Sequence, residues 1–343
     1  MANMKSRTSR EIATYLTLAS ITIFSVMPSR LLAGPVGEQV EAGAATFARN
    51  GNQTVIDVST QNAIINYQSF NIGAQEYVRF NQLNATSRVL NRINGGSPTH
   101  IDGHLSANGQ VYFVNPAGVM FGQGAVIDVA GIYAAAGNMN SQDFLNGINR
   151  FSNLTGDVSN FGTINAQFVA LVGKRVINDG IIFAPGGVVT MVAGDEVVIG
   201  EKNSNIMVKV EGGDANATDA AVVNTGTVDT GADGQVALGA GDMYWLGVKQ
   251  EETGSVTGGD VVVEAEGASV EITGTVDSTN STRVLADEIA FYTVGIGAGD
   301  VTLTGNQVTV GNISGAGAVN VLGTAHDDLM IIDLSHGMAL PDG

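Results

Sequence analysis

The sequence predicts an all-β protein of the solenoid class, a parallel β-helix built from many short strands. Glycine provides 46 of the 343 residues and proline only six, while 44% of the residues are apolar. This composition is typical of short strands joined by glycine turns and argues against disorder. A short phrase, x-x-Gly-Thr-Val, also recurs in the second half of the chain, and several copies lead into another glycine turn and an apolar strand. Each unit therefore reads as turn, strand, turn, strand.

The recurring phrase sets the expected repeat of the solenoid. Its copies follow at uneven gaps that divide into units of about twenty residues with inserts, a coil length found in β-solenoids. One such unit cannot bury its own apolar face, so successive units must stack with their strands in register. A β-sandwich would instead show cleaner alternation and two-residue hairpin turns, which are scarce in the second half. The copies are Asn160-Phe-Gly-Thr-Ile164, Asn178-Asp-Gly-Ile-Ile182, Asn224-Thr-Gly-Thr-Val228 and Ile272-Thr-Gly-Thr-Val276.

Residues 1–33 are predicted to be a secretory signal peptide. Basic side chains precede an apolar stretch at residues 12–27, and small residues offer a cleavage point near Ala33. The stretch is short and rich in Ser and Thr, so no stable membrane span is expected. The alternative is a buried or amphipathic N-terminal helix. Cleavage would leave 11 basic and 32 acidic side chains, a net charge of 11 − 32 = −21.

Charge and cysteine content exclude several classes of function. The formal net charge is −18 with only 15 Lys and Arg, so no basic stripe exists for nucleic acid or an anionic membrane surface. The absence of cysteine excludes thiol catalysis, disulfides and thiolate metal sites, and suits export through an oxidising compartment. Residues 34–180 carry 7 basic and 9 acidic side chains, whereas 181–343 carry 4 and 23. The second half is therefore expected to be a solvated scaffold, with residues 211–220 projecting as a polar loop.

An ordered series of short words occupies residues 66–136. It resembles the haemagglutination-activity, or two-partner secretion, domain found at the start of filamentous haemagglutinins, haemopexin-binding exoproteins and contact-dependent inhibition toxins. The resemblance is densest across residues 66–136 and extends from residue 34 to about residue 250. The words are Asn66-Tyr-Gln-Ser-Phe-Asn-Ile-Gly73, Val78-Arg-Phe-Asn81, Val89-Leu-Asn-Arg-Ile93, Ile101-Asp-Gly103, Leu105-Ser-Ala-Asn-Gly-Gln110, Val111-Tyr-Phe-Val-Asn-Pro-Ala-Gly118, Val119-Met-Phe-Gly122 and Val129-Ala-Gly131.

The resemblance implies a right-handed, single-stranded parallel β-helix with an N-terminal β cap. It assigns residues 34–250 to the secretion domain and leaves 251–343 as continuing acidic, glycine-rich repeats, with a truncated product as an open alternative. It also implies export through the periplasm of a Gram-negative-type bacterium and then through a partner outer-membrane β-barrel transporter. Folding would take place at the cell surface, rung upon rung, without a cofactor or metal.

The best-known word of that family, Asn-Pro-Asn-Gly, is present in altered form as Asn115, Pro116, Ala117 and Gly118. The resemblance implies that these residues are a secretion motif recognised by the transporter. Asn, Pro and Gly at these positions are also favoured in a type I turn, so the motif is equally interpreted as a structural turn. The missing amide at Ala117 puts in doubt a transporter contact by that side chain. The family's companion word, Asn-Pro-Asn-Leu, is not found, so the pairing with the transporter would be divergent.

Two groups of residues that contain histidines are candidate metal ligands. His100 and His104 have the spacing of a helical metal pair, but Gly103 and the resemblance indicate a loop with ordinary surface histidines. A second group has no recognised ligand spacing and is interpreted as a solvated edge of the last rungs. Its members are His326, Asp327, Asp328, Asp333 and His336.

Four aspartates follow a glycine near a strand start, namely Asp195, Asp242, Asp260 and Asp300. Stacked rungs could align them as a ladder that binds calcium or acts on polysaccharide, but Gly-Asp is also an ordinary turn dipeptide, and this interpretation is favoured. No catalytic, cofactor-binding or metal-binding residue is therefore predicted.

The leading functional hypothesis is a secreted, adhesin-like or haemagglutinin-like surface exoprotein with no catalytic activity. Its partners would be the transporter and a carbohydrate or protein receptor on a host cell or other surface. One alternative is a β-helical polysaccharide-acting enzyme, suggested by the shared architecture and the aspartate series. Another is the N-terminal carrier portion of a contact-dependent toxin, although 251–343 shows no change of composition toward a globular effector.

Overall fold

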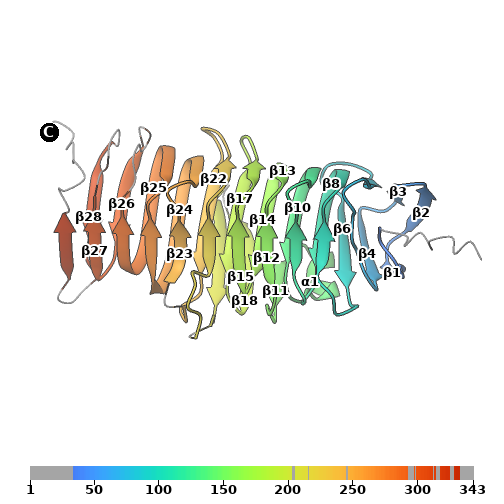
Figure 1. Ribbon diagram of the computed structural model, residues 1–343, viewed down its shortest axis with the longest axis horizontal. Coiled ribbons are helices and arrows are strands. Elements are labelled where there is room, and N and C mark those ends of the chain that lie inside the picture. Colours follow the sequence, from blue (N-terminus) through green and yellow to red (C-terminus); the bar gives the residue numbers. More distant parts are fainter. Residues whose placement is uncertain are drawn as a thin grey trace, which may run out of the picture. The chain divides into compact units, whose positions relative to one another are not determined.

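The computed structural model describes residues 34–202, 205–214, 216–244, 246–292, 297, 299–311, 313, 317–324 and 328–332. The predicted signal peptide with Ala33 lies outside these residues, as do four members of the second histidine group, His326, Asp327, Asp333 and His336. The described chain is an all-β parallel solenoid, so the predicted fold class is confirmed (Figure 1).

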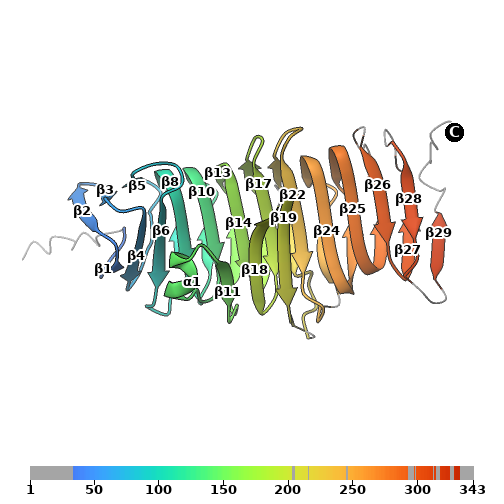
Figure 2. The same cartoon turned by 180° about the vertical axis from the view of Figure 1, so that it is seen from behind.

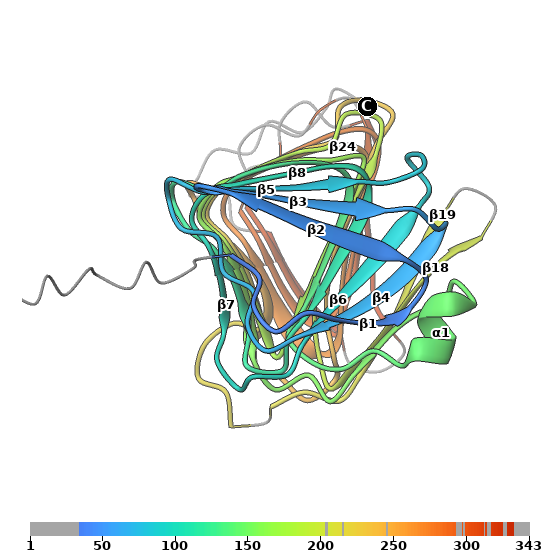
Figure 3. The ribbon, with the colours of Figure 1, turned by 90° about the vertical axis from the view of Figure 1, so that its right-hand side faces the viewer.

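Three faces, each a parallel sheet, form the solenoid, and Figure 3 shows them along its axis. Face A contains β3 (Gln53–Val58), β5 (Tyr77–Asn81), the starts of β8 (His104–Val114) and β10 (Val126–Ala135), β13 (Thr163–Asn165), β16 (Ile181–Phe183), β21 (Thr227–Asp229) and the starts of β24 (Ser255–Ile272) and β25 (Thr275–Phe291). Face B contains β4 (Asn62–Tyr67), β6 (Arg88–Ile93), the ends of β8 and β10, β14 (Phe168–Gly173), β17 (Val188–Ala193), β22 (Gln235–Ala240), the middles of β24 and β25, β26 (Asp300–Thr304) and β28 (Val319–Leu322). Face C contains β7 (Thr99–Ile101), β9 (Val119–Phe121), β12 (Asp157–Asn160), β15 (Arg175–Asn178), β20 (Val222–Asn224), β23 (Leu246–Gln250), the ends of β24 and β25, β27 (Gln307–Val310) and β29 (Leu329–Ile332).

The parallel register stacks like side chains into columns inside the solenoid. Each buried Val, Ile or Leu of such a column contributes about 1.5–3 kcal/mol relative to exposure, which no single rung could obtain alone. One inward column of face B runs Ala63, Val89, Val111, Ile132, Val169, Val189, Val236, Val261, Thr282, Val301 and Val319.

An antiparallel cap precedes the first rungs, as the resemblance implied. β2 (Ala45–Asn50) pairs antiparallel with β3 through a turn at Gly51, whose φ of +60° suits glycine. β1 (Gln39–Ala42) pairs antiparallel with β4. Because β2 and β1 pair with β3 and β4, they cover the open edge of the first rung.

A second layer lies outside face B and was not predicted from the sequence. It consists of α1 (Ser141–Leu145) and an antiparallel sheet of β11 (Asn149–Ser152), β18 (Glu196–Lys202) and β19 (Asn205–Glu211). Figure 2 shows these elements in front of the solenoid strands. They enclose a second core with the outward side chains of face B, including Leu90, Tyr112, Val172 and Val192.

This layer explains the residue patterns of face B and corrects one expectation. Strands beneath it are buried on both sides and read as continuous apolar runs, as in β14 and, apart from Thr190, in β17, whereas the uncovered β26 alternates. The polar loop expected at residues 211–220 is only the return of a longer excursion that begins with the β18–β19 hairpin. Within the described residues, no helix is long and apolar enough to cross a membrane.

Candidate functional site

Residues Asn115–Gly118 form a hydrogen-bonded turn at the corner between faces B and C. The Gly118 N–H donates to Asn115 O at 2.9 Å, which closes the turn, and the Ala117 N–H donates to Asn115 Oδ1 at 3.0 Å. Gly118 has a φ of +117°, a conformation in which an added Cβ would be strained. The local geometry is therefore that of a turn whose residue types match its backbone requirements.

The side chain of Asn115 faces the protein interior. Its relative exposure is 1%, and its Nδ2 donates to Ser97 O at 2.9 Å and to Thr99 Oγ1 at 3.0 Å. Pro116 and Ala117 are half-buried, so they are the members of the motif with side-chain surface open to another molecule. The amide of Asn115 thus fixes one rung to the preceding corner, while the exposed part of the turn is apolar.

The next rung supports the turn from the other side. Thr155 Oγ1 donates to Pro116 O at 3.0 Å, and a Cβ added at Gly156 would lie 2.7 Å from the same oxygen. Glycine at residue 156 therefore permits the close approach of the two corners.

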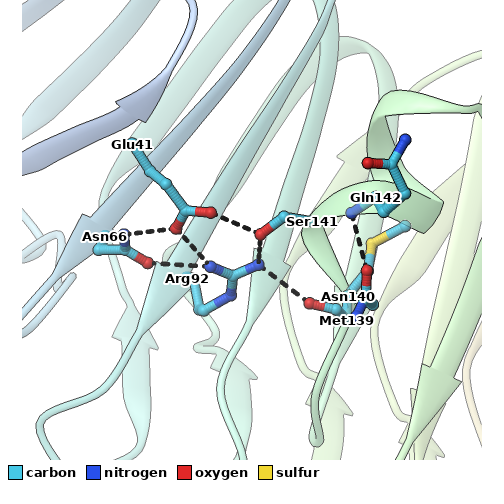
Figure 4. A network of polar contacts seen from close by, with 7 residues as sticks. All are labelled: Glu41, Asn66, Arg92, Met139, Asn140, Ser141 and Gln142. Carbon is cyan, nitrogen blue, oxygen red and sulfur yellow. Dashed lines mark hydrogen bonds and ion pairs between the residues drawn. The ribbon is translucent and has the colours of Figure 1, made fainter.

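A polar network near this corner joins the cap, face B and the outer layer (Figure 4). Arg92 Nη1 donates to Glu41 Oε2 at 2.8 Å and to Asn66 Oδ1 at 3.2 Å. Arg92 Nη2 donates to Met139 O and to Ser141 Oγ, each at 3.0 Å. Ser141 Oγ in turn donates to Glu41 Oε1 at 2.5 Å. One guanidinium thus connects β1, β4 and the start of α1.

The carboxylate of Glu41 is stabilised in its charged form. Hydrogen bonds from Ser141 and then Asn66, together with the positive charge of Arg92, lower the pKa of Glu41 below its usual 4.5. The network therefore holds the cap most firmly when Glu41 is ionised.

The helix α1 is the first element of the outer layer along the chain. Asn140 caps it, because its Oδ1 accepts from the Gln142 N–H at 2.8 Å. The buried Phe144 meets the Tyr112 ring edge to face at 5.2 Å, and the Arg88 guanidinium lies 5.1 Å from the Phe144 ring centre. A local signal for this helix was present in the sequence, since Asn140 is a favoured N-cap residue and Asp143 places an acidic side chain in the first turn.

A ladder of buried amides follows face C. Asn160 Nδ2 donates to Asn178 Oδ1 at 2.8 Å, Asn178 Nδ2 to Asn224 Oδ1 at 2.7 Å, and Asn224 Nδ2 to Gln250 Oε1 at 2.8 Å. The first three are the asparagines that open the recurring phrase. The Nε2 of Gln250 has no hydrogen-bond partner among the described residues. The same column continues as Ile272, Phe291, Val310 and Ile332.

His100 and His104 lie in separate strands. His100 is in β7 on face C and His104 opens β8 on face A, so they flank a corner, and the expected loop is confined to Asp102 and Gly103 between the two strands. His104 Nε2 is 3.3 Å from Asp128 Oδ2, and its ring centre is 5.5 Å from that of Tyr77. No group of three or more potential ligands that could hold a metal occurs within the described part of the chain.

The four aspartates do not align in one ladder. Asp260 and Asp300 share a column at the start of face B strands, separated by Ser281. Asp195 and Asp242 instead follow the ends of β17 and β22. Lys174 Nζ contacts Asp195 Oδ1 at 2.5 Å, and the Gly213 N–H donates to Asp195 Oδ2 at 3.2 Å. These contacts hold a corner of the fold together.

Comparison with known proteins identifies the class. A family model of the TPS secretion domain, where TPS denotes two-partner secretion, matches residues 33–249. Two proteins named heme/hemopexin-binding protein are similar to the chain. One, from Haemophilus influenzae strain Rd, is 36% identical over 209 residues, which are 57% of this chain and 23% of the relative. The other, also from Haemophilus influenzae, is 40% identical over 93 residues, or 27% and 10%.

Solved structures agree on the fold. The HMW1 secretion domain from Haemophilus influenzae superposes with a TM-score of 0.63 at 21% identity, covering 88% of this chain and all of that one. The filamentous hemagglutinin secretion domain gives a TM-score of 0.50 at 16% identity, with the same coverage.

The chain therefore belongs to the TPS secretion domain family, whose members are parts of secreted exoproteins of Gram-negative bacteria. Its resemblance to that family, stated above from the words at residues 66–136, is confirmed. The chain spans about a quarter or less of the length of the curated relatives that it matches.

Proposed function

We propose that residues 34–250 direct export of the exoprotein through a partner outer-membrane β-barrel, and that 251–343 continue the solenoid at the cell surface. The observation that carries this proposal is a coincidence of boundaries. The family match ends at residue 249, and the amide ladder ends at Gln250. The cap and the outer layer also lie before this point. These features support treating residues 34–250 as the unit of export.

Within that unit we propose that Asn115 acts by fixing the corner, and that the exposed surface of Pro116 and Ala117 is what the transporter contacts. The buried amide of Asn115 supports the first role, because it binds Ser97 and Thr99 inside the fold. The half-exposed neighbours support the second. The two interpretations of the motif then describe different residues of one turn.

Secretion in a Gram-negative host, with and without a candidate partner barrel, tests this proposal. Native chain should be released only with the partner, and Asn115→Ala should reduce release. Asn84→Ala is the matched control, because Asn84 also makes a side-chain turn, with its Oδ1 accepting from the Thr86 N–H at 2.9 Å, but is exposed. Release without any partner, or equal loss in both variants, would contradict the proposal.

We further propose that the exported protein binds a ligand at the cell surface and does not catalyse a reaction. Haem or hemopexin is the first ligand to test, because both curated relatives carry that name. An adhesive receptor on a host cell is the second. Purified secreted protein should bind haem in an absorbance titration or retain hemopexin on a column. Failure of both, with binding to host cells, would favour adhesion.

A further inference from the structure

A groove of about 1100 Å³ lies on face B where the outer layer ends. One wall is β19, through Val208, Lys209 and Val210, and the floor is the outward side of β22, β24 and β25. Neighbouring side chains of a strand point to opposite faces, yet three consecutive residues of β19 line the groove. The groove therefore meets the edge of β19 as well as one of its faces.

The edge of β19 that borders the groove is open. β19 pairs with β18 on its other side, and none of the described strands pairs with it here. Such an edge presents backbone N–H and C=O groups that can pair with an added strand. With seven residues, β19 offers an edge of about 23 Å, at about 3.3 Å for each residue.

The lining of the groove contains more acidic than basic side chains. Five carboxylates line it against two basic side chains, Lys209 and Arg283. None of the five forms an ion pair with a described residue, and Asp260 accepts one hydrogen bond, from Ser281 Oγ at 2.7 Å. The carboxylates are Asp242, Asp260, Glu264, Glu266 and Asp287.

We propose that this groove binds an extended, Lys- or Arg-rich segment of another protein, which adds as a fourth strand to the outer sheet. The open backbone of β19 would provide main-chain hydrogen bonds, as in other cases of strand addition. Basic side chains of the segment would meet the unpaired carboxylates, and alternate apolar ones would lie over Ala237 and Val262. This is a binding site distinct from the turn at Asn115.

A labelled peptide of seven residues, Thr-Lys-Val-Lys-Thr-Lys-Val, blocked at both ends, tests the proposal by fluorescence anisotropy on the full chain. It should bind, and the analogue with Glu in place of Lys should not. Two analogues, each methylated on one of the two alternating sets of backbone nitrogens, keep the charge. The analogue whose methyl groups face β19 cannot pair with it and should bind at least about tenfold more weakly. Equal binding of the methylated and unmodified peptides would overturn strand addition and indicate adsorption of a polycation. No binding of the Lys peptide would overturn the site.

Two protein variants with the same change of charge complete the test. Glu264→Lys, in the groove, should weaken binding of the Lys peptide about tenfold, since like charges would then oppose each other. Glu252→Lys, in an exposed turn away from the groove, should leave it within a factor of about two. Equal effects of the two variants would show that net charge and not the groove governs binding.

Discussion

The rungs before and after Gln250 have the same backbone architecture but differ in the side chains of faces B and C. From Asn160 to Gln250, face C carries a hydrogen-bonded amide column, and the face B strands up to β17 are buried on both sides by the outer layer. After Gln250, the same column is apolar, and strands such as β26 alternate between buried and exposed residues. The backbone ladder therefore needs neither feature. The amide column and the second core are additions specific to the secretion-domain part of the chain.

The apolar column after Gln250 can be disrupted by inserting an amide into it. Phe291→Asn would bury an unpaired amide and leave a cavity, so we expect a loss of about 5 kcal/mol in stability. Ile272→Asn introduces the same group beside the unpartnered Gln250 Nε2. It should cost about 2 kcal/mol less, because the new Oδ1 can accept from Gln250. Urea unfolding of both variants measures the difference, and equal losses would show that the ladder cannot be extended.

Truncation of the Phe144 side chain, which packs the outer layer against face B, should affect only the rungs before Gln250. Phe144 is fully buried against Tyr112, and Phe144→Ala should cost about 4 kcal/mol. Hydrogen exchange should increase in α1 and in face B strands from β4 to β14, with no change in β24 to β27, because rungs couple mainly to their neighbours. An equal increase of hydrogen exchange along the whole chain would contradict the view that the rungs before and after Gln250 are separately stabilised.

The amide ladder should depend on its central member. Asn178→Ala would leave Asn160 Nδ2 and Asn224 Oδ1 buried without their partner, and we expect a loss of about 3 kcal/mol. Val310→Ala, in the apolar continuation of the same column, should cost about 2 kcal/mol through its cavity alone. Differential scanning calorimetry can compare the two, and a smaller loss for Asn178→Ala would show that the amides contribute little.

The smallest effect is expected at Glu41. Because its pKa is lower in the folded state than its usual 4.5, its contribution is present above about pH 4.5 and is lost as the pH falls through the folded value. Glu41→Gln should therefore lower stability by up to about 1 kcal/mol at pH 7 and make the acid side of the stability curve flatter. High salt should reduce the difference. An unchanged pH profile would remove Glu41 from the attachment of the cap.

The recurring phrase marks the repeat, and its first residue also marks the extent of the amide ladder. Three copies begin with Asn160, Asn178 and Asn224, and the fourth begins with Ile272, which is where the amide ladder has ended. The corner position of the phrase follows from its Gly-Thr-Val pattern. Pairing between amides does not, because it depends on a register across gaps of 18 and 46 residues.

The outer layer was missed for a different physical reason. The sequence Glu196-Val-Val-Ile-Gly-Glu-Lys202 contains a short apolar run like those of the solenoid strands, and only tertiary packing decides that it leaves the stack to cover face B. The motif at Asn115 was recognised as a turn, but its burial depends on Ser97 and Thr99 of the preceding corner. Local words thus predicted the rungs, while contacts between rungs determine the site.

Secretion of the two parts separately tests the central claim most directly. Residues 1–250, and residues 251–343 joined to residues 1–33, should each be expressed in a Gram-negative host with the partner barrel and located by immunoblot of medium and periplasm. The account predicts release of the first and periplasmic retention of the second. Release of the second, or retention of the first with release of the full chain, would contradict the assignment of export to residues 34–250, which contain the cap and the second core.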